Sequence, residues 1–189
     1  MMQAVSVEYA CSCESHMVDS RIPLSKRVWD MELNENSDYQ LCFACGKQNP
    51  FGLHMTFRLD NGTVVSDFHP QPEHQGFPGV IHGGIIATVL DEALNRTSML
   101  TEQPAWSMTG RLEIRYRHYV PYGPLLRVRA ALGKQKGRMI QATGAVTLAD
   151  DESKILAEAQ GTFMALAPEV LDQIMQDYPG MRTFLERSE

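Results

Sequence analysis

The chain has 189 residues, 43% of them hydrophobic and 21% charged, which is the composition of a globular domain with a core of its own. Its formal net charge of −6 argues against a protein that binds nucleic acid. The longest apolar stretch, residues 80–90, is too short to span a bilayer, so no membrane partner is expected. The first basic residue, Arg21, follows three acidic ones, so we predict no targeting peptide and expect a cytoplasmic protein.

The chain changes character at about residue 40. Residues 1–40 show no sustained periodicity and are interpreted as an irregular arm. From Leu53 to Leu59 apolar and polar residues alternate, which predicts a half-buried strand. Asp60-Asn61-Gly62 predicts a tight turn, and residues 63–68 predict the returning strand. The three prolines of residues 69–78 predict a loop.

A long helix is predicted to start at His82 and to end near Leu100. Its buried stripe recurs at intervals of three and four residues and consists of Ile85, Ile86, Val89, Leu90, Ala93 and Leu94. A second face is small or polar, which lets another backbone come close, and it consists of Gly84, Ala87, Thr88, Asp91, Asn95 and Ser98. One carboxylate, that of Asp91, is therefore predicted in the middle of this second face.

Alternating patterns predict four more strands, at residues 111–117, 126–132, 140–148 and 155–163. The turns between them are predicted at residues 121–124, 133–137 and 150–153. Pro168 opens a last amphipathic helix that extends to about Arg187 and is interrupted at Pro179-Gly180. Short turns make neighbouring strands antiparallel, and one long helix must cover one face of the sheet. The predicted fold is α+β, with an arm (1–40), a core domain (41–166) and a C-terminal helical extension (167–189).

The chemistry-bearing motif is Gly79-Val80-Ile81-His82-Gly83-Gly84, with Asp91 nine residues after the histidine. Free N–H groups at a helix N-terminus carry the positive end of the helix dipole and suit an oxyanion. Glycine also lets a ligand come within contact distance, which makes Gly79 and Gly84 candidate substrate-binding residues. A partly buried carboxylate on the same helix can act as a nucleophile or as the base that activates water.

The stretch from Gly76 to Asp91, Gly-Phe-Pro-Gly-Val-Ile-His-Gly-Gly-Ile-Ile-Ala-Thr-Val-Leu-Asp, resembles the hot-dog thioesterase superfamily, and within it the phenylacetate-pathway-type branch. The resemblance extends back to Cys42-Phe43-Ala44-Cys45-Gly46 and Asn49-Pro50-Phe51-Gly52-Leu53. It extends forward through Met108-Thr109 and residues 116–121, so it covers about residues 40–166.

The resemblance implies a hot-dog fold, in which an antiparallel sheet wraps around one long central helix. It also implies hydrolysis of acyl-coenzyme A, or a related acyl thioester, to a free acid and a thiol. No cofactor and no metal are expected. The expected assembly is a homo-oligomer, either a dimer or a dimer of dimers.

Specific roles follow from the same resemblance. Asp91 matches the acidic residue that acts as base or nucleophile, and the Gly83 amide matches the donor that polarises the thioester carbonyl. His82 matches a residue that shapes the oxyanion pocket. Thr109 matches a Ser or Thr that comes from the partner subunit and positions water, although β-propensity explains a Thr at a strand start equally well. Some relatives have an Asn where this chain has Gly76, so water must be held in another way.

From Arg111 to Arg138 the chain has eight bases and one acid, Glu113. Such an excess indicates either an anionic ligand or solvated strand faces and subunit contacts. Within this stretch Lys134, Lys136 and Arg138 flank a predicted turn. They are candidates to bind the phosphates of coenzyme A, and solvated turn residues are the alternative.

The four cysteines are Cys11, Cys13, Cys42 and Cys45. The second pair has a spacing suited to zinc, but the first pair is too close for a usual zinc site. The acidic N-terminal segment without a signal peptide makes disulfides unexpected. The resemblance implies that Cys42 and Cys45 pack where the chain enters the domain.

Two other functions stay open at this point. A hydratase or dehydratase of acyl thioesters needs a His and a carboxylate placed to move protons at the α and β carbons, whereas His82 is followed by two glycines. A non-catalytic protein that binds acyl thioesters gains nothing from a carboxylate beside an acyl chain, because burying that charge costs free energy.

Overall fold

The computed structural model describes residues 41–101 and 105–179. The predicted N-terminal arm, Cys11 and Cys13 therefore lie outside the described residues. A six-stranded antiparallel sheet has the order β1-β2-β6-β7-β8-β5, and a separate short hairpin pairs β3 with β4. The strands of the large sheet are β1 (Arg58–Asp60), β2 (Thr63–Phe68), β5 (Ser107–Tyr116), β6 (Leu126–Lys136), β7 (Met139–Leu148) and β8 (Ala157–Ala165).

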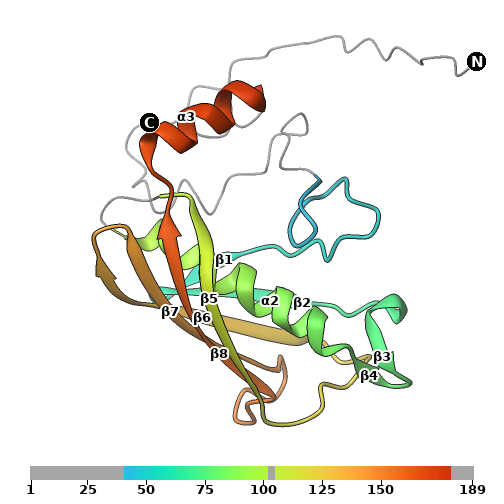
Figure 1. Ribbon diagram of the computed structural model, residues 1–189. Coiled ribbons are helices and arrows are strands. Elements are labelled where there is room, and N and C mark those ends of the chain that lie inside the picture. Colours follow the sequence, from blue (N-terminus) through green and yellow to red (C-terminus); the bar gives the residue numbers. More distant parts are fainter. Residues whose placement is uncertain (1–40, 102–104, 180–189) are drawn as a thin grey trace, which may run out of the picture.

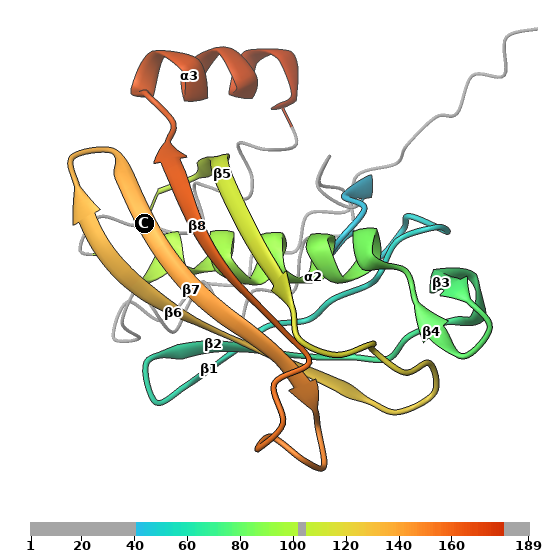
Figure 2. The same cartoon turned by 60° about the horizontal axis from the view of Figure 1, so that its bottom comes forward.

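One long helix, α2 (Gly83–Arg96), lies against one face of the large sheet and continues as the 3-10 helix η3 (Thr97–Leu100). Figures 1 and 2 show the sheet curving around α2, with β5 and β8 alongside it. The predicted buried stripe of the helix is confirmed at five of its positions, since Ile86, Val89, Leu90, Ala93 and Leu94 are all fully buried. The predicted α+β hot-dog fold is thus confirmed.

The sheet comes close to α2 where two of its strands carry glycine. A β-carbon at Gly144 of β7 would lie 2.6 Å from Leu94 Cδ1 and 2.7 Å from the Arg129 carbonyl oxygen. A β-carbon at Gly161 of β8 would lie 3.3 Å from Leu94 Cδ2. These two positions therefore leave the space that the Leu94 side chain fills in the core.

The hairpin β3 (Gln75–Phe77) and β4 (Val80–Ile81) precedes α2, and a 3-10 helix, η2 (Pro72–His74), precedes the hairpin. The sequence predicted only a loop here, because the prolines obscured these short elements. Residues 53–57 also form no strand, although the backbone N–H groups of Leu53 and Met55 donate to Phe43 and Ala44. The segment 53–57 thus pairs with the turn at Phe43 and Ala44 rather than with the sheet.

The predicted turn at residues 133–137 is wrong, because β6 continues to Lys136 and β7 begins at Met139. Lys134 and Lys136 consequently lie in a strand rather than in a turn. The C-terminal helix α3 (Pro168–Asp177) begins at the predicted proline and ends before the predicted interruption. Figure 1 shows α3 projecting beyond the end of β8. No helix in the described ranges is both long and apolar enough to cross a membrane.

Carboxylates from other elements pair with much of the basic stretch. Arg129 donates to Asp60 at 2.8 Å and to Glu152 at 2.6 Å, and Arg127 donates to Asp67 at 2.6 Å. These arginines lower the pKa of Glu152 to about 2. Arg117 similarly pairs with Glu158 at 2.5 Å. The local excess of bases along the sequence is therefore largely compensated on the folded sheet.

Candidate active site

Asp91 lies in the middle of α2 and is partly buried. Its Oδ1 accepts a hydrogen bond of 2.8 Å from the Thr109 hydroxyl of β5. Among the described residues, no protein group donates a hydrogen bond to the second carboxylate oxygen. One oxygen is therefore fixed in place while the other is left to accept a proton.

The hydrogen bond between Thr109 and Asp91 forms within one chain, whereas the resemblance implied that Thr109 faces Asp91 from the partner subunit. The orientation of Thr109 towards α2 depends on a β-bulge in β5, where the pairing with β8 shifts register between Thr109 and Arg111. Thr109 pairs with the buried Phe163, so its side chain faces α2. Without the bulge, alternation from Leu112 would turn Gly110 inward and Thr109 outward. A bulge that redirects a side chain in this way is common beside active sites.

Two further hydrogen-bonded pairs join α2 to β5. Near the C-terminal end of α2, Asn95 Nδ2 donates to the Ser107 carbonyl at 3.1 Å, and Ser107 Oγ donates to Asn95 Oδ1 at 2.6 Å. At the N-terminal end the Tyr116 hydroxyl donates to the Gly83 carbonyl at 2.7 Å. We call these two pairs and the Thr109–Asp91 bond the α2–β5 seam. It fixes the helix lengthwise along an edge strand.

The sequence analysis missed Tyr116, Ser107 and Asn95 as functional partners. Asn95 was placed on the small polar face of the helix, but nothing in a single strand indicates which helix residue it will meet. The available signal was the run of hydroxyl side chains in the segment 107–116. This signal could be interpreted only with knowledge of the bulge in β5, because the bulge changes which side chains of the strand face α2.

Burial raises the pKa of Asp91 above its ordinary value, while the Thr109 hydrogen bond lowers it and the nearby Glu92 charge raises it. Burial is the largest of these effects because the carboxylate loses contact with water when α2 packs on β5. A raised carboxyl pKa favours proton transfer near neutral pH and is typical of catalytic acids and bases.

The N-terminus of α2 offers one free amide. The His82 side chain caps the helix, because its Nδ1 accepts a 2.9 Å hydrogen bond from the Gly84 N–H. Accepting this bond requires an unprotonated Nδ1, so the proton of a neutral His82 ring is on Nε2. Among the described residues the Gly83 N–H has no acceptor, and Gly83 is exposed. The predicted oxyanion donor is thus available, whereas the Gly84 amide is already used.

The loop before α2 holds His82 in position. The His82 N–H donates to the carbonyl of His74, whose ring is buried and stacks on Phe68. A β-carbon at Gly76 would lie 3.0 Å from the His82 ring. The His82 ring therefore packs closely against Gly76, the position at which the resemblance implies an Asn in some relatives. Gly79 has a φ of 78° in the β3–β4 turn, and its N–H donates to Gln75, so the structure gives this predicted binding residue a role in the turn.

A hollow of about 360 Å³ lies beside the free Gly83 amide. It is lined by the start of α2 and by the segment that follows β5, and its residues include Ile86, Tyr116, Arg117, His118 and Tyr119. The lining combines apolar side chains such as Ile86 with the polar groups of Tyr116, Arg117 and His118, so the hollow offers both an apolar surface and hydrogen-bonding groups.

The predicted phosphate-binding residues lie near the C-terminal end of α2, whereas Gly83 is at its N-terminal end. Lys134, Lys136 and Arg138 are exposed near the β6–β7 turn, and Arg138 Nη1 donates to the Ala165 carbonyl at 3.4 Å. Ala165 pairs with Ser107, at the end of β5 that meets the C-terminal part of α2. Within one chain these bases are therefore not brought to Gly83.

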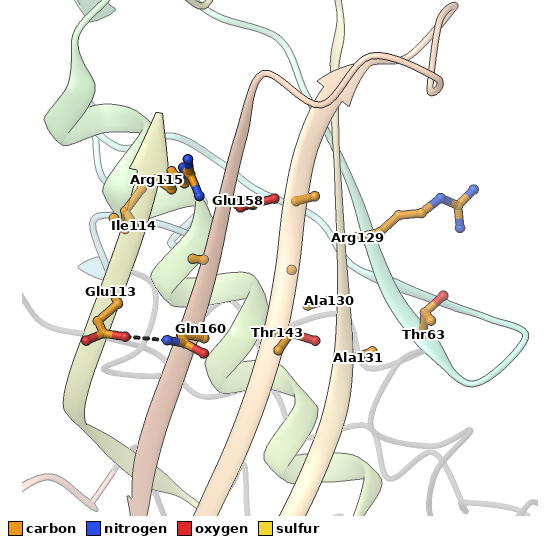
Figure 3. Close-up of a pocket in the computed structure, with 13 residues that line it drawn as sticks. Thr63, Glu113, Ile114, Arg115, Arg129, Ala130, Ala131, Thr143, Glu158 and Gln160 are labelled. Carbon is orange, nitrogen blue, oxygen red and sulfur yellow. Dashed lines mark hydrogen bonds between the residues drawn. The ribbon is translucent and has the colours of Figure 1, made fainter. Parts of the chain in front are cut away.

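A larger hollow of about 660 Å³ lies on the face of the sheet away from α2 (Figure 3). Figure 3 shows Glu113 and Gln160 linked across its floor, with Arg115 and Glu158 at one end. Hydrogen bonds from Gln160 and Arg111 lower the pKa of Glu113, which therefore stays ionised and is a weak base. Asp91, whose pKa is raised, lies on the other face of the sheet, on α2 and against β5. Among the described residues no cluster of three or more His, Cys, Asp or Glu could hold a metal ion.

A family model described as the thioesterase superfamily matches residues 78–155, which include α2 and the strands β5, β6 and β7. The predicted resemblance to this superfamily is thus confirmed for the matched segment. The segment includes Gly83, Asp91 and Thr109.

Curated relatives that the chain resembles include the bovine acyl-coenzyme A thioesterase THEM4, which is 32% identical over 110 residues, 58% of this chain and 44% of the relative. The rat protein of the same name is 30% identical over 156 residues, 82% of this chain and 63% of the relative. The chain thus spans less than half of the bovine protein and under two thirds of the rat protein.

The crystal structure of zebra fish thioesterase superfamily member 2 has the same fold, with a TM-score of 0.57 at 21% identity. The superposition covers 72% of this chain and 99% of that one.

Replacing Asp91 with Asn should raise the free energy of unfolding at neutral pH. The folded-state pKa of Asp91 is raised, so above that pKa the native protein carries a buried charge that Asn lacks, and Asn keeps an oxygen for Thr109. Below the ordinary pKa of an aspartate both states are protonated, so the difference should disappear as the pH falls. Urea unfolding at neutral and acid pH measures it.

The matched control is Glu92→Gln, one residue along the helix. Glu92 pairs with Arg96 at 2.9 Å, so this change should lower stability at neutral pH. An Asp91→Asn protein that is less stable than the wild type at neutral pH contradicts a carboxylate that is costly to bury.

Proposed function

We propose that the protein hydrolyses acyl-coenzyme A thioesters in a site that two copies of the chain build together. The observation that carries this proposal is the Asp91 carboxylate, half-buried, with a raised pKa and with one oxygen held by Thr109. The names of the bovine and rat relatives support acyl-coenzyme A as the substrate class. A protein that only binds acyl thioesters has no use for this buried carboxylate.

In the proposed reaction, the free oxygen of Asp91 takes a proton from a water molecule that the Thr109 hydroxyl helps to orient. The water oxygen attacks the thioester carbonyl carbon, and the carbonyl electrons move onto oxygen. A Gly83 N–H at a helix N-terminus stabilises the resulting oxyanion. When the carbonyl reforms, the carbon–sulfur bond breaks, and the thiolate takes up the proton, giving a free acid and a thiol.

One chain alone does not bring these groups to one substrate. Gly83 and Asp91 are eight residues apart on α2, which is about 12 Å along the helix axis. An oxyanion donor must lie about 3 Å from the carbonyl oxygen, and the attacking water about 3 Å from the carbon. We therefore assign the oxyanion donor Gly83 to one chain, and the base Asp91 with Thr109 to its partner.

The exposed edge of the sheet supports this assembly. β5 is the last strand in the sheet order, and an unpaired edge is suited to pairing with a second copy. Antiparallel pairing of two β5 strands about a twofold axis would set the two α2 helices antiparallel as well, because the seam fixes each helix along its strand. The N-terminus of one helix then faces the middle of the other. The same arrangement would bring Lys134, Lys136 and Arg138 towards the partner's Gly83 end.

A panel of acyl-coenzyme A substrates with thiol detection tests the activity. Asp91→Asn should lower kcat by at least about a hundredfold, the scale for losing a general base. Thr109→Val should lower it less, because Thr109 orients the carboxylate and water without accepting a proton. Near-normal turnover in Asp91→Asn would remove this residue from the mechanism.

Substitutions at Gly83 test its amide separately. Gly83→Pro deletes the N–H and adds a ring that the backbone accommodates, since proline is favoured at the first position of a helix and the His82 backbone (φ −60°, ψ 133°) is compatible with a following proline. It should lower kcat by about 10²–10³-fold. Gly83→Ala is the matched control: it keeps the N–H, and its β-carbon would lie 3.5 Å from the Tyr116 hydroxyl, an ordinary contact.

Mixing inactive variants tests the two-chain site. In a mixed dimer of Asp91→Asn and Gly83→Pro one site carries both changes and the other carries neither, so about a quarter of wild-type activity should return at random exchange. A mixture of Asp91→Asn and Thr109→Val should gain nothing, because both residues belong to the same half of the site. Recovery in this second mixture, or none in the first once exchange is demonstrated by mass spectrometry, contradicts the assignment.

A further inference from the structure

Cys42 and Cys45 lie at the two ends of a closed turn, where the chain enters the domain. The turn is closed by a 2.9 Å hydrogen bond from the Gly46 N–H to the Cys42 carbonyl. The segment that follows the turn is tied to it by two hydrogen bonds. The Leu53 N–H donates to the Phe43 carbonyl at 2.8 Å, and the Met55 N–H donates to the Ala44 carbonyl at 2.9 Å. Residues three apart in such a turn have Cα atoms within about 7 Å, a separation that overlaps the range a disulfide spans.

The two thiols are free and differ in exposure. Cys42 is partly exposed, whereas Cys45 is buried at 4% exposure. The side chains are hydrogen-bonded to each other, so no large movement separates them. An external reagent therefore meets Cys42 first, and Cys45 is reached from Cys42.

A cation lies beside the pair. Arg96, in the last turn of α2, donates from Nη2 to Cys45 Sγ at 3.0 Å and from Nε to Glu92 at 2.9 Å. Its guanidinium also lies over the Phe57 ring, 5.1 Å from the ring centroid. This guanidinium can stabilise the negative charge that Cys45 acquires when it loses its proton to attack a second sulfur.

The hydrogen bond from the Cys45 thiol lowers the pKa of Cys42 to about 6, while the same bond and, to a lesser extent, burial raise the pKa of Cys45. Cys42 thus carries the thiolate at neutral pH, and Cys45 keeps its proton. A low-pKa exposed thiol beside a protonated buried one is the arrangement of an attacking cysteine and a resolving cysteine.

We propose that Cys42 and Cys45 form a redox-active dithiol that is oxidised reversibly to an intramolecular disulfide by low-molecular-weight disulfides. The Cys42 thiolate attacks one sulfur of the oxidant, whose second sulfur leaves as a thiolate, and a mixed disulfide forms at Cys42. Cys45 then loses its proton and attacks the Cys42 sulfur, which expels the remaining half of the oxidant. The protein loses two electrons, and the oxidant is reduced to two thiols. Arg96 then no longer faces a thiol at Cys45, so oxidation changes a contact of the catalytic helix.

The test uses the full chain with Cys11→Ser and Cys13→Ser, which leaves Cys42 and Cys45 as its only cysteines. The protein is incubated with glutathione disulfide, trapped with a maleimide and analysed by intact mass. Both thiols should become protected together with no glutathione retained, and a dithiol reductant should restore both. Protein that keeps both thiols, or that forms disulfide-linked dimers instead, overturns the proposal.

Two single variants separate the attacking thiol from the resolving one. With Cys45→Ser the reaction should stop at one glutathione on Cys42, and with Cys42→Ser the buried Cys45 should stay largely unreacted. Equal rates in the two variants contradict the assigned order. In the parent protein, alkylation of Cys42 should rise with a midpoint near pH 6 and shift upward in Cys45→Ala. A midpoint at the ordinary thiol value in the parent contradicts the proposal without relying on any variant.

Discussion

The hydrogen bond between Thr109 and Asp91 is the contact around which the site is organised. It holds the carboxylate of a helix against an edge strand, and it partly offsets the cost of burying that charge. The pairs at either end of the α2–β5 seam keep the register between helix and strand, so Asp91 stays opposite Thr109. The sheet glycines that accommodate Leu94 let the same helix pack closely on β7 and β8. The contacts that pack α2 on the sheet are therefore also the contacts that position the Asp91 carboxylate.

The length of α2 imposes the second constraint. Its free amide is at the N-terminus and its carboxylate more than two turns further on, too far apart to serve one carbonyl carbon. The proposed two-chain site combines the two groups by using two helices, and the exposed edge strand β5 belongs to the surface that a second copy would cover. On the opposite face of the sheet, the hollow holds Glu113, whose pKa is lowered by hydrogen bonds from Gln160 and Arg111.

Much of the fold could be predicted from the sequence, because periodicity directly reports which side of an element is buried. The helix from His82 to Leu100 and the strand at 63–68 lie where the pattern placed them. The site could be predicted only as a set of residues. The resemblance implied that Thr109 comes from the partner subunit, whereas the structure pairs it with Asp91 of the same chain. Its inward orientation depends on a bulge next to Gly110 that reverses the alternation of β5, which no single-strand pattern indicates. The capping of Gly84 by His82 likewise depends on a side-chain conformation that spacing does not specify.

The most direct test of the account is the pH dependence of kcat/KM for an acyl-coenzyme A substrate. Asp91 acts as a base when ionised, so the rate should fall on the acid side with a midpoint above the ordinary pKa of an aspartate. Because the Thr109 hydrogen bond lowers the pKa of Asp91, Thr109→Val should move that midpoint further upward. An acid limb at the ordinary aspartate value, or one that does not move in Thr109→Val, would contradict a site organised around these two residues.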